Sequence, residues 1–156
     1  MPDLSPVASK FILHWGELGT RWGISRTVAQ IHALLYLSGR PLHAEEICET
    51  LDLARSNVST ALKELQNWGI VRVAHIMGDR RDHFESMKDV FEMFRVIMNE
   101  RKRREIDPTL VLLRESVSDM QKVKGTDPLT KERLEGMLEF FEPVSYTHLT
   151  LPTKRI

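Results

Sequence analysis

The chain has 156 residues, with 22 basic and 22 acidic side chains and no formal net charge. This balance argues against a protein that coats nucleic acid through bulk positive charge, and it leaves room only for a local, shaped contact surface. The N-terminus lacks a basic region followed by an apolar run, and no long stretch is free of charge. We therefore expect a cytoplasmic protein without a membrane segment.

The first forty residues predict two helices. Residues 7–22 form a helical arm that we expect Gly16 and Gly19 to interrupt, and Ser25 is suited to cap a second helix over residues 26–37. We assign residues 1–24 to an N-terminal arm.

An amphipathic helix that begins after His43 follows, then a break at Leu51-Asp52-Leu53 and a second helix over residues 55–68. The second helix has an apolar stripe at three- and four-residue spacing, which must face a core. That stripe consists of Val58, Ala61, Leu62, Leu65 and Trp68. The opposite face is polar and carries Arg55, Ser56, Asn57, Ser59, Thr60 and Lys63. Such side chains donate to phosphate oxygens and base edges, although for this helix alone an ordinary solvated face explains the pattern equally well.

A β-hairpin is predicted next. Residues 70–76 are β-branched and alternating, Gly78-Asp79 can make a tight turn, and residues 82–85 return as the second strand. Arg80 and Arg81 would then lie at the hairpin tip, within reach of a DNA backbone or minor groove. Residues 55–81 hold five basic and two acidic side chains, so positive charge is concentrated here. Two helices followed by a basic hairpin are typical of a winged helix-turn-helix, with the hairpin as its wing.

The second half of the chain predicts helices that each carry an apolar stripe, or seam, at three- and four-residue spacing. A first helix over residues 87–98 is followed by a charged stretch, 100–105, which we interpret as a solvated helix end; a second DNA-binding patch in residues 101–104 stays open as the alternative. Asp107-Pro108 predicts the start of a new helix, and residues 130–141 predict the last one.

These seams are more apolar than one small core needs, so we expect a symmetric homodimer rather than a larger monomeric core. The expected interface consists of Phe91, Phe94, Met98, Leu110, Val117, Leu138 and Phe141. The predicted fold class is mainly α with a small β-wing. It comprises a winged helix-turn-helix domain over residues 25–86 and a helical dimerisation region over residues 87–143.

The last segment, residues 144–156, resembles a translated transposase sequencing adapter. We therefore exclude it from the fold as a non-native tail. Without its two basic residues the chain has 20 basic against 22 acidic side chains, a formal charge of −2.

No metal or redox site is expected. Cys48 is the only cysteine, which excludes an intramolecular disulfide, and it shares a helix stripe with Ala44, Ile47 and Leu51. We expect it to be a buried structural thiol. The histidines show no spacing typical of metal ligands, and we expect no cofactor.

The wing residues 78–85 and the aromatic segment 89–94 resemble those of the GbsR-like branch of the MarR transcriptional regulators, within a match from about Phe11 to Arg114. The resemblance implies a dimeric winged-helix regulator, usually a repressor, that binds double-stranded DNA at a pseudo-palindromic operator. It maps the DNA-reading surface onto the polar face of residues 55–68 and onto Arg80 and Arg81. His43 and Ala54 depart from the pattern, because a Ser or Thr usually caps each helix there; we expect each helix end to lose ~1 kcal/mol.

Some members of this branch are similar to regulators that sense choline. An aromatic cage for a quaternary ammonium would draw on Trp15, Trp22, Tyr36 and Trp68, although aromatic side chains at helical spacing belong far more often to a core. This effector is the weakest of the expectations.

An enzymatic function is not expected. The sequence has no P-loop, no His-Glu-x-x-His and no dinucleotide-binding fingerprint. The alternatives to a DNA-binding regulator are a winged-helix module that binds protein only and, less favoured, an enzyme subunit.

Overall fold

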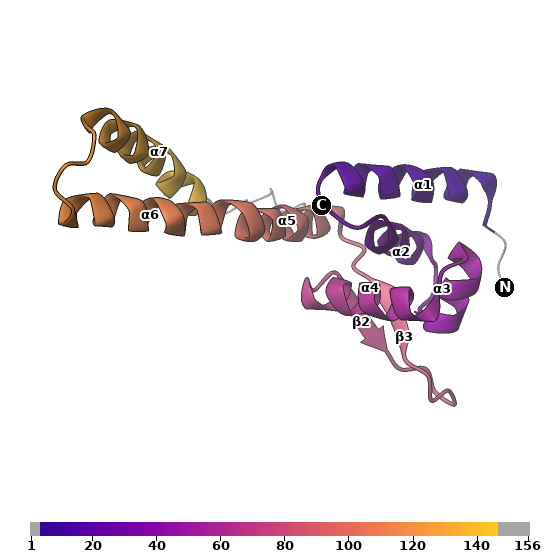
Figure 1. Ribbon diagram of the computed structural model, residues 1–156. Coiled ribbons are helices and arrows are strands. Elements are labelled where there is room, and N and C mark those ends of the chain that lie inside the picture. The colour runs from indigo at the N-terminus through magenta and orange to yellow at the C-terminus, as the bar shows by residue number, and fades with distance from the viewer. Residues whose placement is uncertain (1–3, 147–156) are drawn as a thin grey trace, which may run out of the picture. The chain divides into compact units, whose positions relative to one another are not determined.

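The computed structural model describes residues 4–146 and divides the chain into two units, Met1–Met93 and Phe94–Ile156. Helix α5 (Val90–Arg101) contains the division. The boundaries expected from the sequence at residues 24, 86 and 143 stay predictions. Within the described residues, no helix is long and apolar enough to cross a membrane. The predicted class, mainly α with a small β-wing, is confirmed (Figure 1).

The first unit begins with α1 (Pro6–Arg21) and α2 (Arg26–Leu37). Ser5 caps α1 by accepting a hydrogen bond from the amide of Ala8 (3.1 Å), and Ser25 caps α2 in the same way, as predicted. The expected interruption of α1 at its glycines is wrong, because the helix runs through both of them.

Gly16 and Gly19 are buried because α2 lies directly against them. A Cβ on Gly16 would lie 2.9 Å from Cγ of Gln30, and a Cβ on Gly19 would lie 2.7 Å from Cβ of Ala29. Both distances are too short for carbon atoms, so the glycines set how closely α1 packs on α2.

The helix-turn-helix consists of α3 (Ala44–Leu51) and α4 (Arg55–Asn67). Asp52 ends α3 with a left-handed φ of 53°, and Gly69 follows α4 with a φ of 79°. The buried residues of α4 are Val58, Ala61, Leu62 and Leu65, which confirms most of the predicted stripe. Trp68 lies just past the helix and is half-buried.

The expectation that His43 weakens the start of α3 is wrong. Its ring Nδ1 accepts a hydrogen bond from the amide of Glu46 (3.3 Å), while its Nε2 lies 2.9 Å from the Glu46 carboxylate. The His43 side chain therefore caps α3, and the Glu46 carboxylate holds its ring in place, whereas in a capping box the carboxylate bonds to the backbone amide of the cap residue. Ala54 makes no side-chain cap on α4, as expected.

A three-stranded antiparallel sheet completes the winged fold. Its order is β1 (Leu42–His43), β3 (His83–Ser86) and β2 (Val71–Ala74), with Phe84 opposite both Leu42 and Val73. The two-residue strand β1 was not predicted. Strand β2 is shorter than the predicted 70–76. At its start the amide of Ile70 bonds to the carbonyl of Leu65 at the end of α4, while the carbonyl of Ile70 accepts from the amide of Met87 (2.8 Å).

The core of the first unit also holds a histidine. His32 is 4% exposed; its Nδ1 accepts a hydrogen bond from the indole N–H of Trp15 (3.3 Å), and its Nε2 lies 3.1 Å from the sulfur of Met93. Burial, and secondarily the charge of Lys88, lower the pKa of His32 to about 4. Cys48 is only half-buried, so the expectation of a fully buried thiol is wrong; burial still raises its pKa.

Lys88 closes the end of α2. Its ammonium donates to the carbonyl oxygens of Leu35 (2.7 Å), Tyr36 (2.8 Å) and Ser38 (3.1 Å). A cation at this place satisfies carbonyls that the last helical turn leaves unpaired and complements the negative end of the helix dipole.

In the second unit, the helix continues from α5 through a π-helical turn (Lys102–Ile106) into α6 (Asp107–Lys122). An α-helix does begin at Asp107 with Pro108 in its first turn, as predicted, but Asp107 is not its cap, because the π-helical turn leads into it without a break. The amide of Asp107 bonds to the carbonyl of Lys102, five residues back, and this wider turn admits the ring of Pro108, which lacks an N–H and would otherwise crowd a preceding carbonyl.

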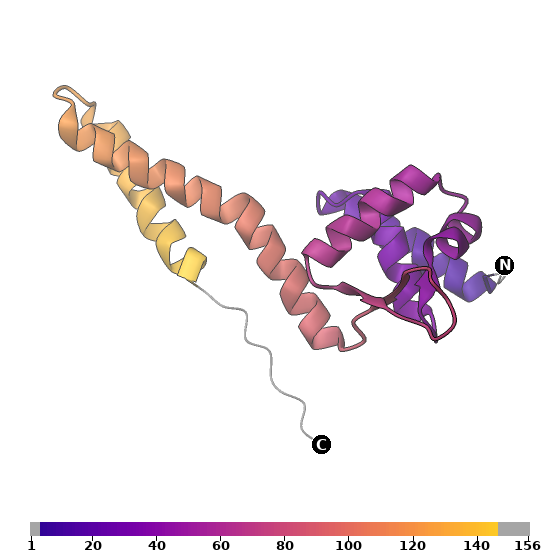
Figure 2. The same cartoon turned by 90° about the horizontal axis from the view of Figure 1, so that it is seen from below.

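Helix α7 (Pro128–Tyr146) packs antiparallel beside α6, as both Figure 1 and Figure 2 show. Leu110 and Leu113 of α6 are buried. Of the predicted adapter tail, residues 147–156 lie outside the described residues, and that interpretation stays a prediction.

Candidate nucleic-acid interface

The outward face of α4 is polar along its whole length. All six side chains predicted to contact DNA are exposed there: Arg55, Ser56, Asn57, Ser59, Thr60 and Lys63. The hydroxyl of Thr60 donates to the carbonyl of Ser56 (3.0 Å), so it is partly engaged by the helix itself. The other side chains project into solvent from a helix whose opposite face is fixed in the core.

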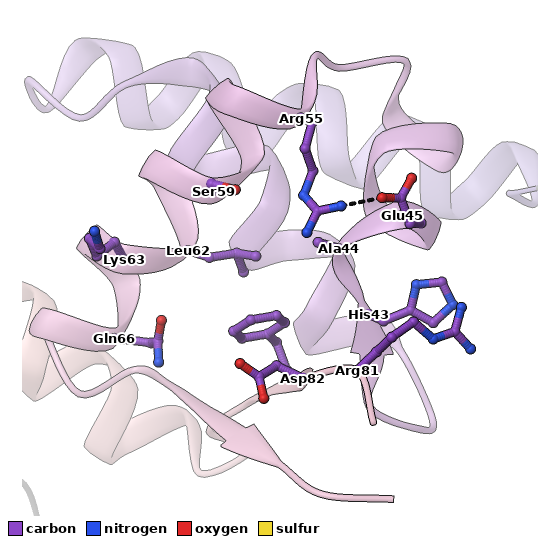
Figure 3. A pocket seen from close by; sticks show the side chains of 11 residues that line it. His43, Ala44, Glu45, Arg55, Ser59, Leu62, Lys63, Gln66, Arg81 and Asp82 are labelled. Atoms are coloured by element: carbon purple, nitrogen blue, oxygen red, sulfur yellow. Dashed lines mark hydrogen bonds and ion pairs between the residues drawn. The ribbon is translucent and has the colours of Figure 1, made fainter. Parts of the chain in front are cut away.

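A groove of about 410 Å³ lies between this face, the start of α3 and the wing. Figure 3 shows Arg55, Lys63 and Gln66 along α4, with Arg81 and Asp82 across the groove. The sequence analysis did not include Gln66. It lies three residues after Lys63 on the same helical face, and that spacing was the signal that would have found it.

Arg55 lines the groove but already has an ion-pair partner. Its guanidinium pairs with the carboxylate of Glu45 from the first turn of α3, and both side chains are more than half exposed (Figure 3). The pair links the two helices at the rim of the groove. A phosphate or base edge that approaches Arg55 must therefore compete with Glu45.

The wing turns at Met77-Gly78, one residue earlier than predicted. Gly78 has a φ of 83°, and the amide of Asp79 donates to the carbonyl of Ile76 (3.1 Å). The carboxylate of Asp79 accepts three hydrogen bonds from Arg81: from its amide (2.9 Å), its Nε (3.0 Å) and its Nη2 (2.8 Å). These bonds hold the pKa of the Asp79 carboxyl well below its usual range and raise that of Arg81.

The two predicted wing arginines therefore differ. The charge of Arg81 is compensated by Asp79, whereas Arg80 is exposed and has no ion-pair partner among the described residues. Arg80 is the arginine of the wing that is ready to meet a phosphate without first breaking a contact.

Two histidines fix the base of the wing against α3. The rings of His43 and His83 meet edge to face with centroids 5.4 Å apart, and their residues are paired across β1 and β3. His83 is 5% exposed; its Nδ1 lies 3.0 Å from the carbonyl of Arg81 and its Nε2 3.5 Å from the carboxylate of Asp79. The wing loop is therefore anchored at its root.

The sequence of this region matches a known family. Residues 22–82, which contain α2, the helix-turn-helix and most of the wing, match the MarR family. Residues 22–82 are a MarR-family domain.

Two relatives and one solved structure extend this match. The HTH-type transcriptional repressor GbsR of Bacillus subtilis is 25% identical over 121 residues, which are 78% of this chain and 67% of GbsR. The HTH-type transcriptional repressor OpcR of the same organism is 20% identical over 120 residues, 75% of this chain and 65% of OpcR. The chain thus spans about two thirds of the length of each relative, and its sequence resembles the GbsR-like branch of the family.

The fold is also that of a solved protein described as a transcriptional regulator. The match to that crystal structure has a TM-score of 0.69 and a sequence identity of 17%. It covers 90% of this chain and 91% of the other chain. The likeness therefore extends beyond the MarR-family domain into the helices that follow it.

The alternative DNA-binding patch that follows the MarR-family domain is compensated within its own helix. Arg103 and Arg104 both donate to the carboxylate of Glu100, at 2.5 and 3.2 Å, and Arg101 pairs with Glu105 at 3.2 Å. The hydrogen bond from Arg103 lowers the pKa of Glu100. These contacts favour the interpretation as a solvated stretch of helix.

The four aromatic side chains suggested for a cage have other contacts. Trp15 stacks on Phe11 and bonds to His32, and the ring of Tyr36 already has the ammonium of Lys88 at 5.7 Å from its centroid. A quaternary ammonium at Tyr36 would have to displace Lys88 from a ring face that the protein already uses.

The predicted interface residues fall into three groups. Phe91 is 40% and Phe94 43% exposed, which is unusual for phenylalanine. Leu110 is buried within the single chain and has little surface left for a partner. The half-buried members are Met98, Val117, Leu138 and Phe141. Exposed apolar residues of α6 and α7 outside the predicted interface include Val111, Leu112, Met137 and Phe140.

Proposed function

We propose that this chain is a sequence-specific DNA-binding transcriptional regulator that acts as a homodimeric repressor. Helix α4 would enter the major groove, and the wing would lie on the adjacent backbone or minor groove. The observation that carries the proposal is the groove between α4 and the wing, where the polar helix face and Arg81 of the wing flank one space in the region that matches the MarR family.

The dimensions of α4 suit this role. A helix of 13 residues is about 20 Å long, and the major groove of B-DNA is about 12 Å wide, which admits one helix with its side chains. Arg55 and Asn57 lie in the first turn. Side chains of these types can form bidentate hydrogen bonds with guanine and adenine, whereas Lys63 and Arg80 are suited to phosphates.

The dimer follows from the exposed apolar side chains of α5, including Phe91 and Phe94. A two-fold dimer would place two copies of α4 on half-sites about one helical turn, ~10 bp, apart. The names of the two relatives support repression, and a small effector of the choline type remains part of the proposal only as a candidate ligand.

The test is a selection of duplexes from a randomised library by the purified full chain, followed by binding measurements on the selected duplex and its single-base variants. We expect Asn57→Ala and Arg55→Ala to relax the preference at particular base pairs, each by ~1–3 kcal/mol. Arg80→Ala should instead weaken binding on every duplex and reduce the salt slope by about one.

Arg133→Ala is the matched control, because it removes one exposed arginine from α7, outside the MarR-family domain. It should change neither preference nor slope. Salt-independent binding, or no selection of any duplex, would contradict the proposal and favour a winged-helix module that binds protein.

A further inference from the structure

The tip of the wing carries two exposed apolar side chains. Met77 is 101% exposed and Ile76 is 41% exposed, whereas Met93 of the same unit is 7% exposed. Met77 thus buries none of its surface within the described chain. An apolar side chain in this position gains most from a partner that removes it from water.

The tip is held in a defined conformation. The turn is closed by the bond from the amide of Asp79 to the carbonyl of Ile76, and Arg81 clamps Asp79 by three further bonds. A loop that is already ordered loses little conformational entropy when it binds. Met77 is therefore presented outward by a turn that needs no rearrangement.

Asp79 and Asp82 balance Arg80 and Arg81 in number at the tip, but one of the two arginines is available to an anionic partner. Arg80 lies three residues beyond Met77, is exposed and has no ion-pair partner among the described residues, while Arg81 is compensated by Asp79. The minor groove of DNA combines an enhanced negative potential with base pairs that an apolar side chain can separate.

We propose that Met77, backed by Ile76, enters the minor groove as an apolar wedge between two stacked base pairs, while Arg80 contacts the flanking phosphate. The proposal rests on the DNA-binding function above and adds a second contact with bases, outside the major groove. Methionine is among the side chains that wedge-forming proteins insert, and pyrimidine–purine steps unstack at least cost. The wing would therefore select such a step beside the site that α4 reads.

A protein partner at the tip is less favoured. Apart from Gly78, the residues that flank the two apolar residues in sequence are polar or charged: His75, Asp79, Arg80, Arg81 and Asp82. Two apolar side chains alone form a patch far smaller than a stable protein interface requires. A narrow groove lined by phosphates fits both the small apolar tip and the charge beside it.

The experiment uses the full chain and the duplex selected from the randomised library, with 2-aminopurine placed in turn at each position flanking the α4 site. Unstacking of one base should raise its fluorescence, and end-labelled duplexes should report a bend by energy transfer. For Met77→Ala we expect loss of the fluorescence rise, a smaller bend and an affinity about tenfold lower. The salt slope should be unchanged, because the substitution removes no charge.

Met137→Ala is the control, because Met137 of α7 is 47% exposed and lies outside the wing; it should leave all four measurements unchanged. A Met77→Ala protein that keeps the fluorescence rise and the bend would overturn the wedge. If the wild type binds duplex in a salt-dependent way but unstacks no base, the wedge is overturned and the proposed function stands. If the wild type binds no duplex, both are overturned. Altered sedimentation of Met77→Ala without DNA would assign the tip to a contact between protein copies.

Discussion

At the scale of single residues, His32 makes stability depend on pH. The folded protein holds this histidine with a pKa of about 4, against 6.5 in an unfolded chain, chiefly because it is buried. Between these values the unfolded chain binds the proton and the folded chain does not. The contribution of His32 is therefore fully present above pH 6.5 and is lost as pH falls toward 4.

We expect the free energy of unfolding to lose about 3 kcal/mol from this source across that range. The measurement is chemical denaturation at several pH values for the wild type and for His32→Gln, which removes the titration. His14→Gln is the control, because His14 is exposed. Identical pH profiles for wild type and His32→Gln would contradict the assignment.

His32 also shows which contacts could not be predicted from the sequence pattern. The sequence predicted the helix over residues 26–37, but nothing in it indicated that the indole of Trp15 and the sulfur of Met93 contact the His32 ring. These partners lie 17 and 61 residues away along the chain. Likewise, Asp79 and Arg81 are close in sequence, yet their clamp depends on a turn that lies one residue earlier than predicted.

At the scale of elements, two glycines in helices should respond in opposite directions to the same substitution. Gly19→Ala would place a methyl group 2.7 Å from Cβ of Ala29, so we expect a loss of about 1–3 kcal/mol as α1 is forced from α2. Gly136→Ala on α7 meets nothing within 4 Å, and alanine favours the helix by about 0.5–1 kcal/mol. Thermal and urea denaturation of both variants would compare them.

If both substitutions stabilise the protein, α1 and α2 are not packed as closely as described. If both destabilise it, Gly136 has a contact beyond the single chain. Either result would be informative because the two variants differ by one methyl group in the same type of element.

Elements with a strong local signal were predicted well. Helix α4 and the strands of the wing follow from apolar periodicity, from Gly69 and from a β-branched run, and the structure confirms them within a few residues. Two of the errors have a common cause: a residue that usually breaks a helix was assumed to do so. Packing on α2 retains Gly16 and Gly19 within α1, and the π-helical turn accommodates Pro108, so tertiary and local geometry override the intrinsic preference. Strand β1 has only two residues and exists because β3 pairs with it.

At the scale of the whole molecule, the exposed apolar side chains lead to a prediction about assembly. We expect the wild type to sediment as a dimer and Phe91→Glu or Met98→Glu to shift it toward the monomer, because a carboxylate in a dry seam is neither paired nor hydrated. Analytical ultracentrifugation across a concentration series would measure the shift.

Leu13→Glu is the control, because Leu13 is 61% exposed on α1 and lies outside the predicted interface. A wild type that is monomeric at all concentrations would remove the seam from the dimer. A dimer that survives both substitutions would move the interface to another face, with Phe140 the next residue to replace.

The carboxylates among the cations of the proposed DNA-binding surface would affect how quickly the protein finds its target. The surface offers Arg55, Lys63, Arg80 and Arg81, but Glu45, Asp79 and Asp82 lie beside them, which leaves a net charge of only +1. Attraction to random DNA grows with the number of phosphates neutralised, so arbitrary sequence holds such a surface weakly and for a short time. The protein would spend little of its search bound to non-specific sites of a genome. Long residence would be confined to sequences whose bases α4 contacts favourably.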